Sequence, residues 1–276
     1  MTITVDFAGK AVVVVGGTSG INRGIAEAFA SHGANVAVAS RSQEKVDDTV
    51  AALTAAGAGM ALGAAFDVRD PEAVAAGLAS FHEALGDIDI VVSGAAGNFP
   101  ALASEMSVNA FKSVVDIDLM GTIHVMKAVY PLLKRPGACV INISAPQAYL
   151  PYDGQAHVCA AKAGVDQITR TLALEWGMEG IRLNSVVPGA IDDTEGMRRL
   201  TTSPKALHAL VDQTPLQRVG YKQDVANMCM FLASDLASFV TGQVIDVDGG
   251  FYLRGSGMMG KMLGDMLRAA KAQKEQ

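Results

Sequence analysis

One lysine stands out among the residues that could do chemistry, because the side chain one helical turn before it is inert. Lys162 lies in the segment Gln155-Ala-His-Val-Cys-Ala-Ala-Lys162, which predicts the start of a long helix that follows a buried strand. Side chains four residues apart share a helix face, and an ammonium group can hold an acid there ready for proton transfer. The position four before Lys162 is Val158, which has no proton to give. A proton donor one helical turn before Lys162 is therefore excluded.

Short apolar runs alternate with Ala-rich stretches of helical period along the whole chain. The expected strands are Ala11–Gly16, Asn35–Ser40, Met60–Asp67, Asp89–Ser93, Cys139–Ser144, Arg182–Val187 and Val244–Val247. The expected helices cover residues 20–32, 42–56, 71–84, 107–133, 155–178 and 222–233. Strands that are apolar throughout indicate a parallel sheet covered on both faces. The predicted fold is α/β: a doubly wound, seven-stranded parallel sheet of the Rossmann type, with its ligand crevice at the carboxyl ends of the strands.

The C-terminal residues form a tail with a separate pattern. Residues 1–255 are expected to form one dinucleotide-binding and catalytic domain, and residues 256–276 an amphipathic helical tail appended to it. The apolar face of this tail comprises Met259, Met262, Leu263, Met266 and Leu267. We expect residues 257–272 to bury that face against the body or a neighbouring subunit, near the substrate mouth.

Composition narrows the possible partners and compartments. The 276 residues carry a net charge of −6 without a long basic block, which argues against nucleic acid as a partner. Cys139, Cys159 and Cys229 form no CxxC or Cys/His cluster, so we expect no disulfide, no metal and a cytoplasmic location. No run of eighteen apolar residues exists, so no membrane partner is expected. Half of the residues are apolar, which leaves surface for subunit contacts.

A glycine-rich turn follows the first expected strand. The turn Gly16-Gly17-Thr18-Ser19-Gly20-Ile21-Asn22 leads directly into a helix. Such a turn lets backbone N–H groups and a helix N-terminus approach a pyrophosphate closely. Its third glycine position is taken by Asn22, a residue that tolerates positive φ better than most. The turn predicts a dinucleotide site.

The end of the second expected strand indicates which dinucleotide binds. Ser40 and Arg41 stand where an acidic residue would hold the adenosine ribose of NAD. A hydroxyl and a guanidinium instead suit a 2′-phosphate. The prediction is NADP rather than NAD, although Arg41 could also be a solvated arginine in a surface turn.

From residue 10 to residue 251 the chain resembles the short-chain dehydrogenases/reductases. The shared features are the glycine-rich turn, Gly94-Ala-Ala-Gly97, the Lys162 helix and Asn184-Ser-Val-Val-Pro188-Gly189. Within this superfamily the chain is most similar to the peroxisomal-type 2,4-dienoyl-CoA reductases. That likeness rests on Ala95-Ala-Gly-Asn-Phe99, Asn109-Ala-Phe-Lys, Asp116-Ile-Asp118-x-x-Gly121, His157 with Lys162, Thr194-Glu-Gly-Met-Arg-Arg199 and Pro215-Leu-Gln-Arg218.

The resemblance implies the roles of individual residues. The tyrosine and serine of ordinary members fall on Val158 and Ala145, and their asparagine falls on Asp118. In the peroxisomal-type reductases an Asp–Lys pair with a water does the acid–base work, which implies that Asp118 and Lys162 are catalytic here. The implied cofactor-binding residues are Gly16, Thr18, Ser19, Gly20, Ile21, Ser40, Arg41, Asp67, Val68, Gly94, Ala95, Lys162, Pro188, Gly189, Ile191 and Thr194.

The implied activity is NADPH-dependent reduction of a 2,4-dienoyl-CoA or a related unsaturated acyl thioester. The implied assembly is a homotetramer formed through the helices at 107–133 and 155–178. Two alternatives stay open at this point. One is a carbonyl reductase that takes its proton from Tyr149 or Tyr152, although loop tyrosines at the crevice mouth are the plainer interpretation. The other is a catalytically silent NADP-binding protein, for which Val158 and Ala145 argue.

Overall fold

A seven-stranded parallel sheet forms the centre of the molecule. The computed structural model describes residues 5–200, 203–255 and 257–274. The strand order is β3-β2-β1-β4-β5-β6-β7, and every neighbouring pair is parallel. The bounds are Ala11–Val15 (β1), Asn35–Ser40 (β2), Met60–Ala65 (β3), Ile90–Ser93 (β4), Cys139–Ile143 (β5), Arg182–Pro188 (β6) and Val244–Val247 (β7). The predicted doubly wound Rossmann sheet is confirmed.

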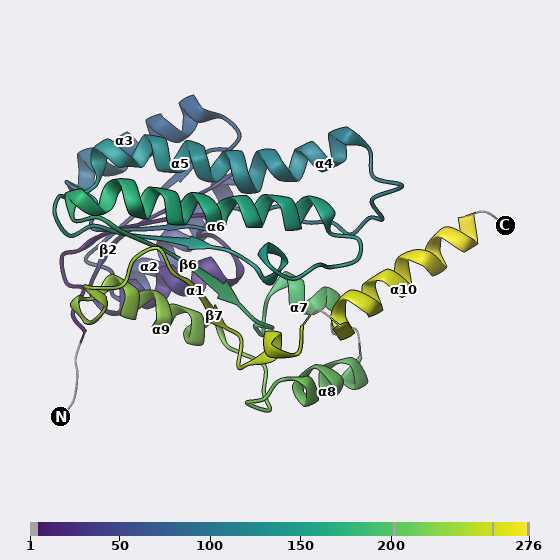
Figure 1. Ribbon diagram of the computed structural model, residues 1–276. Helices are drawn as coiled ribbons and strands as arrows, with labels where there is room; N and C mark the ends of the chain where they lie inside the picture. Colours follow the sequence, from purple (N-terminus) through teal and green to yellow (C-terminus); the bar gives the residue numbers. More distant parts are fainter. Residues whose placement is uncertain (1–4, 201–202, 256, 275–276) are drawn as a thin grey trace.

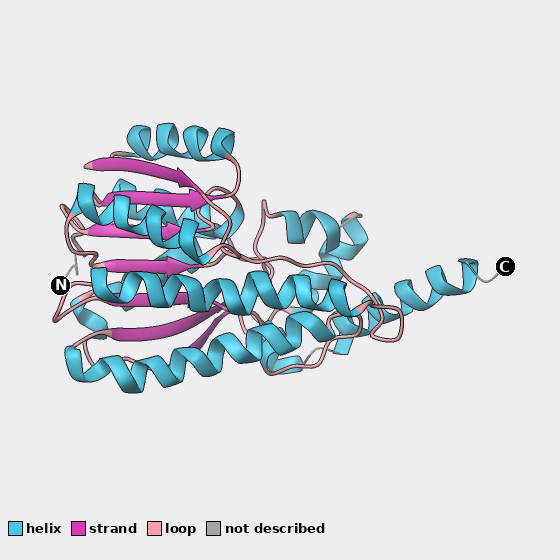
Figure 2. Ribbon diagram, turned by 90° about the horizontal axis from the view of Figure 1, so that it is seen from above, coloured by secondary structure: helices cyan, strands magenta, loops and turns pink. Residues whose placement is uncertain are grey.

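Helices cover both faces of the sheet (Figure 1, Figure 2). One layer packs on alternate residues Val12 and Val14 of β1, and the other packs on Val13 and Val15. The first layer is α1 (Gly20–Ser31), α2 (Gln43–Ala56) and α9 (Lys222–Ala233); the second is α3 (Pro71–Leu85), α4 (Val108–Val115), α5 (Gly121–Val129) and α6 (Ala156–Trp176). This arrangement follows from the period of two along a strand that is buried on both sides.

The two edge strands correct the expectation of burial on both faces. No residue of β3 or β7 belongs to the fully buried class, whereas every residue of β1 does. Edge strands have one neighbour instead of two, so solvent reaches their side chains. The prediction of burial is right for the central strands and wrong for the two edges.

The predicted helix at 107–133 is interrupted. After α4 the chain makes a π-helical turn at Asp116–Met120 (η1), continues as α5 and ends in a short 3₁₀ turn at Tyr130–Leu132 (η2). A π-helical turn inserts a residue into the helical register and is common at functional sites. Asp118 lies in the middle of this turn.

Two helices after β6 were not predicted: α7 (Glu195–Leu200) and α8 (Pro204–Gln213). Short 3₁₀ turns complete the chain: η3 (Pro146–Ala148), η4 (Gly177–Glu179), η5 (Asp235–Ala237) and η6 (Phe251–Arg254). None of the described helices is both long and apolar enough to cross a membrane.

The tail forms α10 (Gly257–Lys274), which points away from the sheet (Figure 1). Its residue Leu267 touches the loop before α6, because a Cβ at Gly154 would lie 2.3 Å from Leu267 Cδ1. Charged contacts extend this docking: Arg268 Nη1 lies 3.5 Å from Asp153 Oδ2. The tail helix therefore docks on the loop from residue 150 to 155.

The predicted apolar face of the tail divides into two parts. Leu263 and Leu267 are half-buried, whereas Met262 is 45% and Met266 is 66% exposed. The side chain of Met259 lies outside the described residues. Burial of the whole face against the body is therefore wrong for Met262 and Met266, and burial against a neighbouring subunit stays a prediction.

Candidate active site

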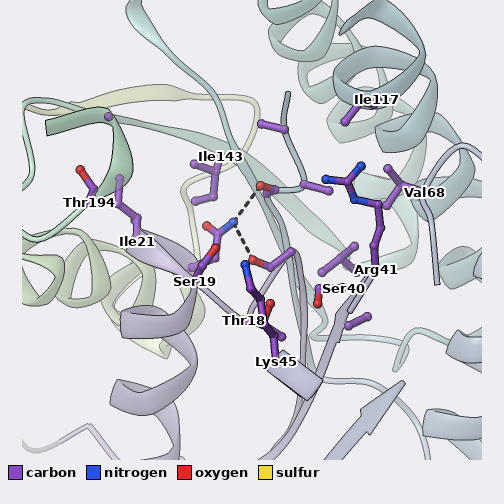
Figure 3. Close-up of a pocket in the computed structure, with 18 of the residues that line it drawn as sticks. Thr18, Ser19, Ile21, Ser40, Arg41, Lys45, Val68, Ile117, Ile143 and Thr194 are labelled. Atoms are coloured by element: carbon purple, nitrogen blue, oxygen red, sulfur yellow. Dashed lines mark hydrogen bonds between the residues drawn. The ribbon is translucent and has the colours of Figure 1, made fainter. Parts of the chain in front are cut away.

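A pocket of about 510 Å³ lies at the carboxyl ends of the central strands (Figure 3). Its wall contains thirteen of the predicted cofactor-binding residues. They are Gly16, Thr18, Ser19, Ile21, Ser40, Arg41, Asp67, Val68, Gly94, Ala95, Gly189, Ile191 and Thr194. Gly20, Pro188 and Lys162 do not line this wall. The pocket is in the place that a doubly wound sheet reserves for a ligand.

The glycine-rich turn is shaped for close backbone approach. Gly16 has φ +77°, and a Cβ there would lie 2.8 Å from Ala95 N. A Cβ at Gly17 would lie 2.7 Å from Val14 O. Side chains at these positions would clash with backbone, so glycine keeps the turn flat beneath the start of α1. A flat turn followed by a helix N-terminus fits a pyrophosphate.

Asn22, at the third glycine position, ties the turn to the loop after β4. Its Nδ2 donates to Gly94 O at 2.8 Å and to Gly16 O at 3.4 Å. The side chain is buried, and a Cβ at Gly94 would lie 2.3 Å from Asn22 Nδ2. The turn therefore survives without its third glycine, because the asparagine amide fills space that Gly94 leaves free.

The adenosine end of the pocket carries a second cation that sequence reasoning missed. Lys45 lines the pocket together with Ser40 and Arg41 (Figure 3). It lies in the first turn of α2, where Ser42 Oγ accepts from Lys45 N at 3.4 Å. The hydroxyl of Ser40 is buried and has no partner among the described residues. Two cations, an unpaired hydroxyl and a helix N-terminus fit a phosphate group.

Asp67 and Thr194 line the pocket, but their side chains already have partners. The carboxylate of Asp67 pairs with Arg69 Nη2 at 2.6 Å, and this hydrogen bond holds the pKa of Asp67 below its usual value. The hydroxyl of Thr194 donates to Ile191 O at 2.8 Å and accepts from Met197 N at 3.2 Å, which caps α7. Thr194 lies across the pocket from Arg41 (Figure 3). Any contact of these two side chains with a dinucleotide stays a prediction.

Asp118 and Lys162 form a buried pair at the base of the site. Lys162 Nζ lies 3.4 Å from Asp118 Oδ2, with side-chain exposures of 7% and 1%. Asp118 Oδ1 accepts from Gly97 N at 2.7 Å, and Lys162 Nζ donates to Ile143 O at 3.0 Å. The π-helical turn therefore brings a carboxylate to the lysine and to the loop after β4. Ile143 also lines the dinucleotide pocket, so the pair lies next to it.

The two loop tyrosines are poorly placed as proton donors. The hydroxyl of Tyr149 donates to Asp246 Oδ1, and burial together with that bond raises its pKa. Burial raises the pKa of Tyr152 to about 12. Neither residue lines the dinucleotide pocket. A phenol that acts as a general acid needs a pKa lowered toward the working pH, so these observations argue against the carbonyl-reductase alternative.

His157, five residues before Lys162, packs among aromatic side chains. Its ring is fully buried and lies 4.6 Å from the ring of Phe99 between centroids. Burial lowers the pKa of His157. These contacts support a packing role for His157.

The chain is similar to several characterised and solved proteins. The model of the family described as enoyl-(acyl carrier protein) reductase matches residues 15–252. Peroxisomal 2,4-dienoyl-CoA reductases of Danio rerio and Rattus norvegicus are 41% and 42% identical, over 91% and 92% of this chain and 84% and 87% of theirs. A probable 2,4-dienoyl-CoA reductase of Bacillus subtilis is 35% identical over 88% of this chain and 97% of its own.

The solved structures agree with this grouping. A short-chain type dehydrogenase/reductase from Mycobacterium ulcerans superposes with a TM-score of 0.87 at 33% identity, covering 95% of this chain and 98% of its own. A Bacillus anthracis short chain dehydrogenase gives a TM-score of 0.78 at 33% identity, covering 88% and 97%. The glycine-rich turn, the strand order and these matches over most of the chain lead to one conclusion: this protein is an oxidoreductase of the short-chain dehydrogenase/reductase family.

Proposed function

We propose that the protein uses NADPH to reduce a 2,4-dienoyl-CoA or a related unsaturated acyl thioester. The observation that carries the proposal is the buried Asp118–Lys162 pair in a site without a phenol or hydroxyl at positions 158 and 145. The relatives whose names specify this reaction support the same substrate class.

The proposed cofactor is NADPH, and the residues present fit it. Gly16 and Gly17 make the flat turn for the pyrophosphate, and Ser40, Arg41 and Lys45 surround the place for a 2′-phosphate. When bound, the reduced nicotinamide supplies a hydride to C5, the far end of the dienyl chain. We propose that Lys162 also hydrogen-bonds the nicotinamide ribose, since its carbonyl partner Ile143 is part of the pocket wall.

The chemistry explains why the usual phenol is dispensable. Hydride addition at C5 moves negative charge onto the thioester oxygen, and the dienolate then takes a proton on carbon. A bare carboxylate facing this charge at 4 Å would cost about 4 kcal/mol at an effective dielectric near 20. The ammonium of Lys162 neutralises Asp118, so the pair can hold and polarise a water without repelling the dienolate.

A panel assay tests the proposal against both alternatives. Purified protein is mixed with NADPH and an enoyl-, a dienoyl- or a ketoacyl-CoA, and oxidation is followed by the loss of nicotinamide absorbance. We expect oxidation with the dienoyl-CoA above all. Oxidation with a ketone that depends on Tyr149 or Tyr152 would establish the carbonyl reductase instead. NADPH binding without oxidation by any substrate would establish the silent protein.

We further propose that the protein is a homotetramer assembled through α4, α5 and α6. In Figure 1 α6 lies alongside α4 and α5. Val108 of α4 is 83% exposed and Leu174 of α6 is 80% exposed, and Met178, in the turn η4 after α6, is 95% exposed. Sedimentation of the wild type and of Leu174→Asp tests this assembly. The three cysteines are free, which supports the proposed cytoplasmic location, whereas the names of the eukaryotic relatives place those proteins in peroxisomes.

A further inference from the structure

The proposed reaction needs a hydrogen-bond donor for the thioester oxygen. The Asp118–Lys162 pair does not supply an obvious one. Lys162 already donates to Ile143 O and faces Asp118. Val158 and Ala145 carry no donor in their side chains. Oxyanion stabilisation is commonly the largest single catalytic contribution, so a donor elsewhere in the site is required.

A cluster of three amide side chains, Asn98, Gln147 and Gln155, lies beside the pair. Gln155 is buried at 8% exposure, and its Oε1 accepts from Gln147 Nε2 at 2.9 Å and from Asn98 Nδ2 at 3.3 Å. In the described part of the chain no acceptor takes a hydrogen bond from Gln155 Nε2. That nitrogen is also not among the unpaired polar atoms that are sealed from solvent, in contrast to Gln147 Oε1. The oxygen of the Gln155 amide thus accepts two hydrogen bonds, whereas its nitrogen donates none to the described residues.

The three amide residues belong to the chain segments that carry Asp118's partner Gly97, Ala145 and Lys162. Gln155 holds the N-cap position of α6, immediately before the helix that carries Lys162, and its side chain makes no capping hydrogen bond. Gln147 follows Ala145 by two residues, and Asn98 follows Gly97, whose N–H is bound by Asp118. The cluster joins the segments of Ala145, Asp118 and Lys162 at one point.

We propose that Gln155 is a catalytic residue whose Nε2 hydrogens bind the thioester oxygen of the substrate and stabilise the dienolate. The inference rests on the proposed dienoyl-CoA reduction. Two amides donating to Oε1 polarise the Gln155 amide and strengthen the donors at its other end. Because the side chain is fixed before substrate arrives, it needs no reorganisation as charge develops.

With NADPH bound, its hydride would form the new C5–H bond and leave NADP⁺, while the two double bonds shift to C3=C4 and C1=C2 and the electron pair comes to rest on the thioester oxygen held by Gln155. The C1=O bond then re-forms while C2 takes a proton from the water held by Asp118 and Lys162. That water regains its proton from solvent through the pair. The product is a 3-enoyl thioester, the product class that the names of the eukaryotic relatives specify.

Gln155→Glu is the sharpest test, because it keeps the shape and both accepted hydrogen bonds but replaces the free N–H donors with oxygen. We expect kcat on a dienoyl-CoA to fall by about 10²–10³-fold, the usual loss for an oxyanion donor. The NADPH dissociation constant should stay within twofold of the wild-type value, and the melting temperature should be unchanged. Gln155→Met places no donor and no charge at this position, so kcat should fall by a similar factor. This variant provides the test if the Gln155→Glu protein does not fold. Gln223→Glu, on the exposed side of α9, is the matched control and should retain wild-type kcat.

A spectroscopic measurement tests the contact without turnover. In the complex of protein, NADP⁺ and a dienoyl-CoA, a hydrogen bond to the thioester oxygen should shift the dienoyl absorbance to longer wavelength. The shift should vanish in Gln155→Met while the dienoyl-CoA still binds. A wild type without any shift, or a Gln155 variant that keeps both the shift and kcat within threefold, overturns the assignment. Failure of all acyl-CoA turnover by the wild type would instead refute the proposed function, and the shift alone would then decide whether Gln155 contacts the thioester.

Discussion

Asn22 and Gly94 share one volume: the amide of Asn22 fills the space in which a side chain at position 94 would have to lie. A Cβ at Gly94 would be 2.3 Å from Asn22 Nδ2 and 2.6 Å from Asn22 Oδ1, and the three nearest atoms all belong to Asn22. The same amide donates to Gly94 O. Since Gly97, in the same loop, donates to Asp118, this interlock connects the glycine-rich turn to the Asp118–Lys162 pair.

The interlock predicts that mutations at these two positions compensate each other. Gly94→Ala alone should destabilise the protein by about 1–3 kcal/mol, as overpacking does, and weaken NADPH binding. In the Asn22→Gly background the added methyl group gains room, so the same change should cost less than half as much. Thermal or denaturant unfolding of the four proteins measures this. Gly177→Ala, where a Cβ meets nothing within 4 Å, is the control for the general effect of the methyl. If Gly94→Ala lowers stability equally in the wild-type and Asn22→Gly backgrounds, Asn22 does not occupy the space that the added methyl group needs.

Cofactor choice should depend on both cations at the adenosine end. Ser40, Arg41 and Lys45 line the pocket without a carboxylate among them, so the wild type should prefer NADPH to NADH. Arg41→Ala should weaken NADPH by about 1.5–3 kcal/mol, roughly ten- to a hundredfold, the size of a charge-assisted hydrogen bond. Lys45→Ala should act in the same direction, while NADH binding changes little in either variant. Titration with both cofactors checks this, and equal wild-type affinities would remove the NADP assignment.

The tyrosines near the site should be dispensable. Because the pKa of Tyr152 is raised to about 12 and the hydroxyl of Tyr149 is engaged by Asp246, neither phenol ionises or donates readily near neutral pH. Tyr149→Phe and Tyr152→Phe should each leave kcat on a dienoyl-CoA within about threefold, far from the loss of an acid–base group. The pH–rate profile of Tyr152→Phe between pH 6 and about 10 should match that of the wild type. A loss of activity well beyond threefold in either Phe variant would support the carbonyl-reductase alternative.

The tail should dock through Leu267 and not through Met266. Leu267 contacts the loop at Gly154, whereas Met266 is 66% exposed. We expect Leu267→Asp, like deletion of residues 256–276, to release the helix and to change acyl-CoA affinity or oligomeric state. Met266→Asp is the matched control on the adjacent position. If Met266→Asp shifts the sedimentation coefficient, a neighbouring subunit covers this residue; if the deletion changes nothing, the tail is an appendage.

Much of this architecture could be predicted from the sequence, because strand burial and glycine geometry act locally. Runs such as Ala11–Val15 have to be central strands, and the glycine-rich turn has to follow the first one. The π-helical turn at Asp118 could not be predicted, since its extra residue produces no change in the apolar period around it. Only the resemblance to the peroxisomal-type reductases indicated that Asp118 pairs with Lys162.

Other features depend on contacts across the fold. Lys45 reaches the pocket only because α2 starts directly beside the end of β2, and Gln155 matters only because the loops of Asn98 and Gln147 meet it. The helices α7 and α8 are short and carry no long apolar stripe, so they were missed. Met262 and Met266 have the same apolar character as Leu267, and only the position of the body decides which of them it covers.

If Asp118 and Lys162 act as one acid–base unit, single-turnover reduction of a dienoyl-CoA by enzyme preloaded with NADPH shows it directly. Asp118→Ala and Lys162→Ala should each slow this step by about 10²-fold or more, and the double variant should be little slower than either alone. Asp118→Asn keeps an acceptor for Gly97 N but loses the charge, so it separates catalysis from the loop contact. Lys162→Ala should also weaken NADPH, whereas Asp118→Ala should leave its binding nearly intact. Rates within threefold of the wild type in either single variant, or losses that multiply in the double variant, would show that Asp118 and Lys162 do not act as one acid–base unit.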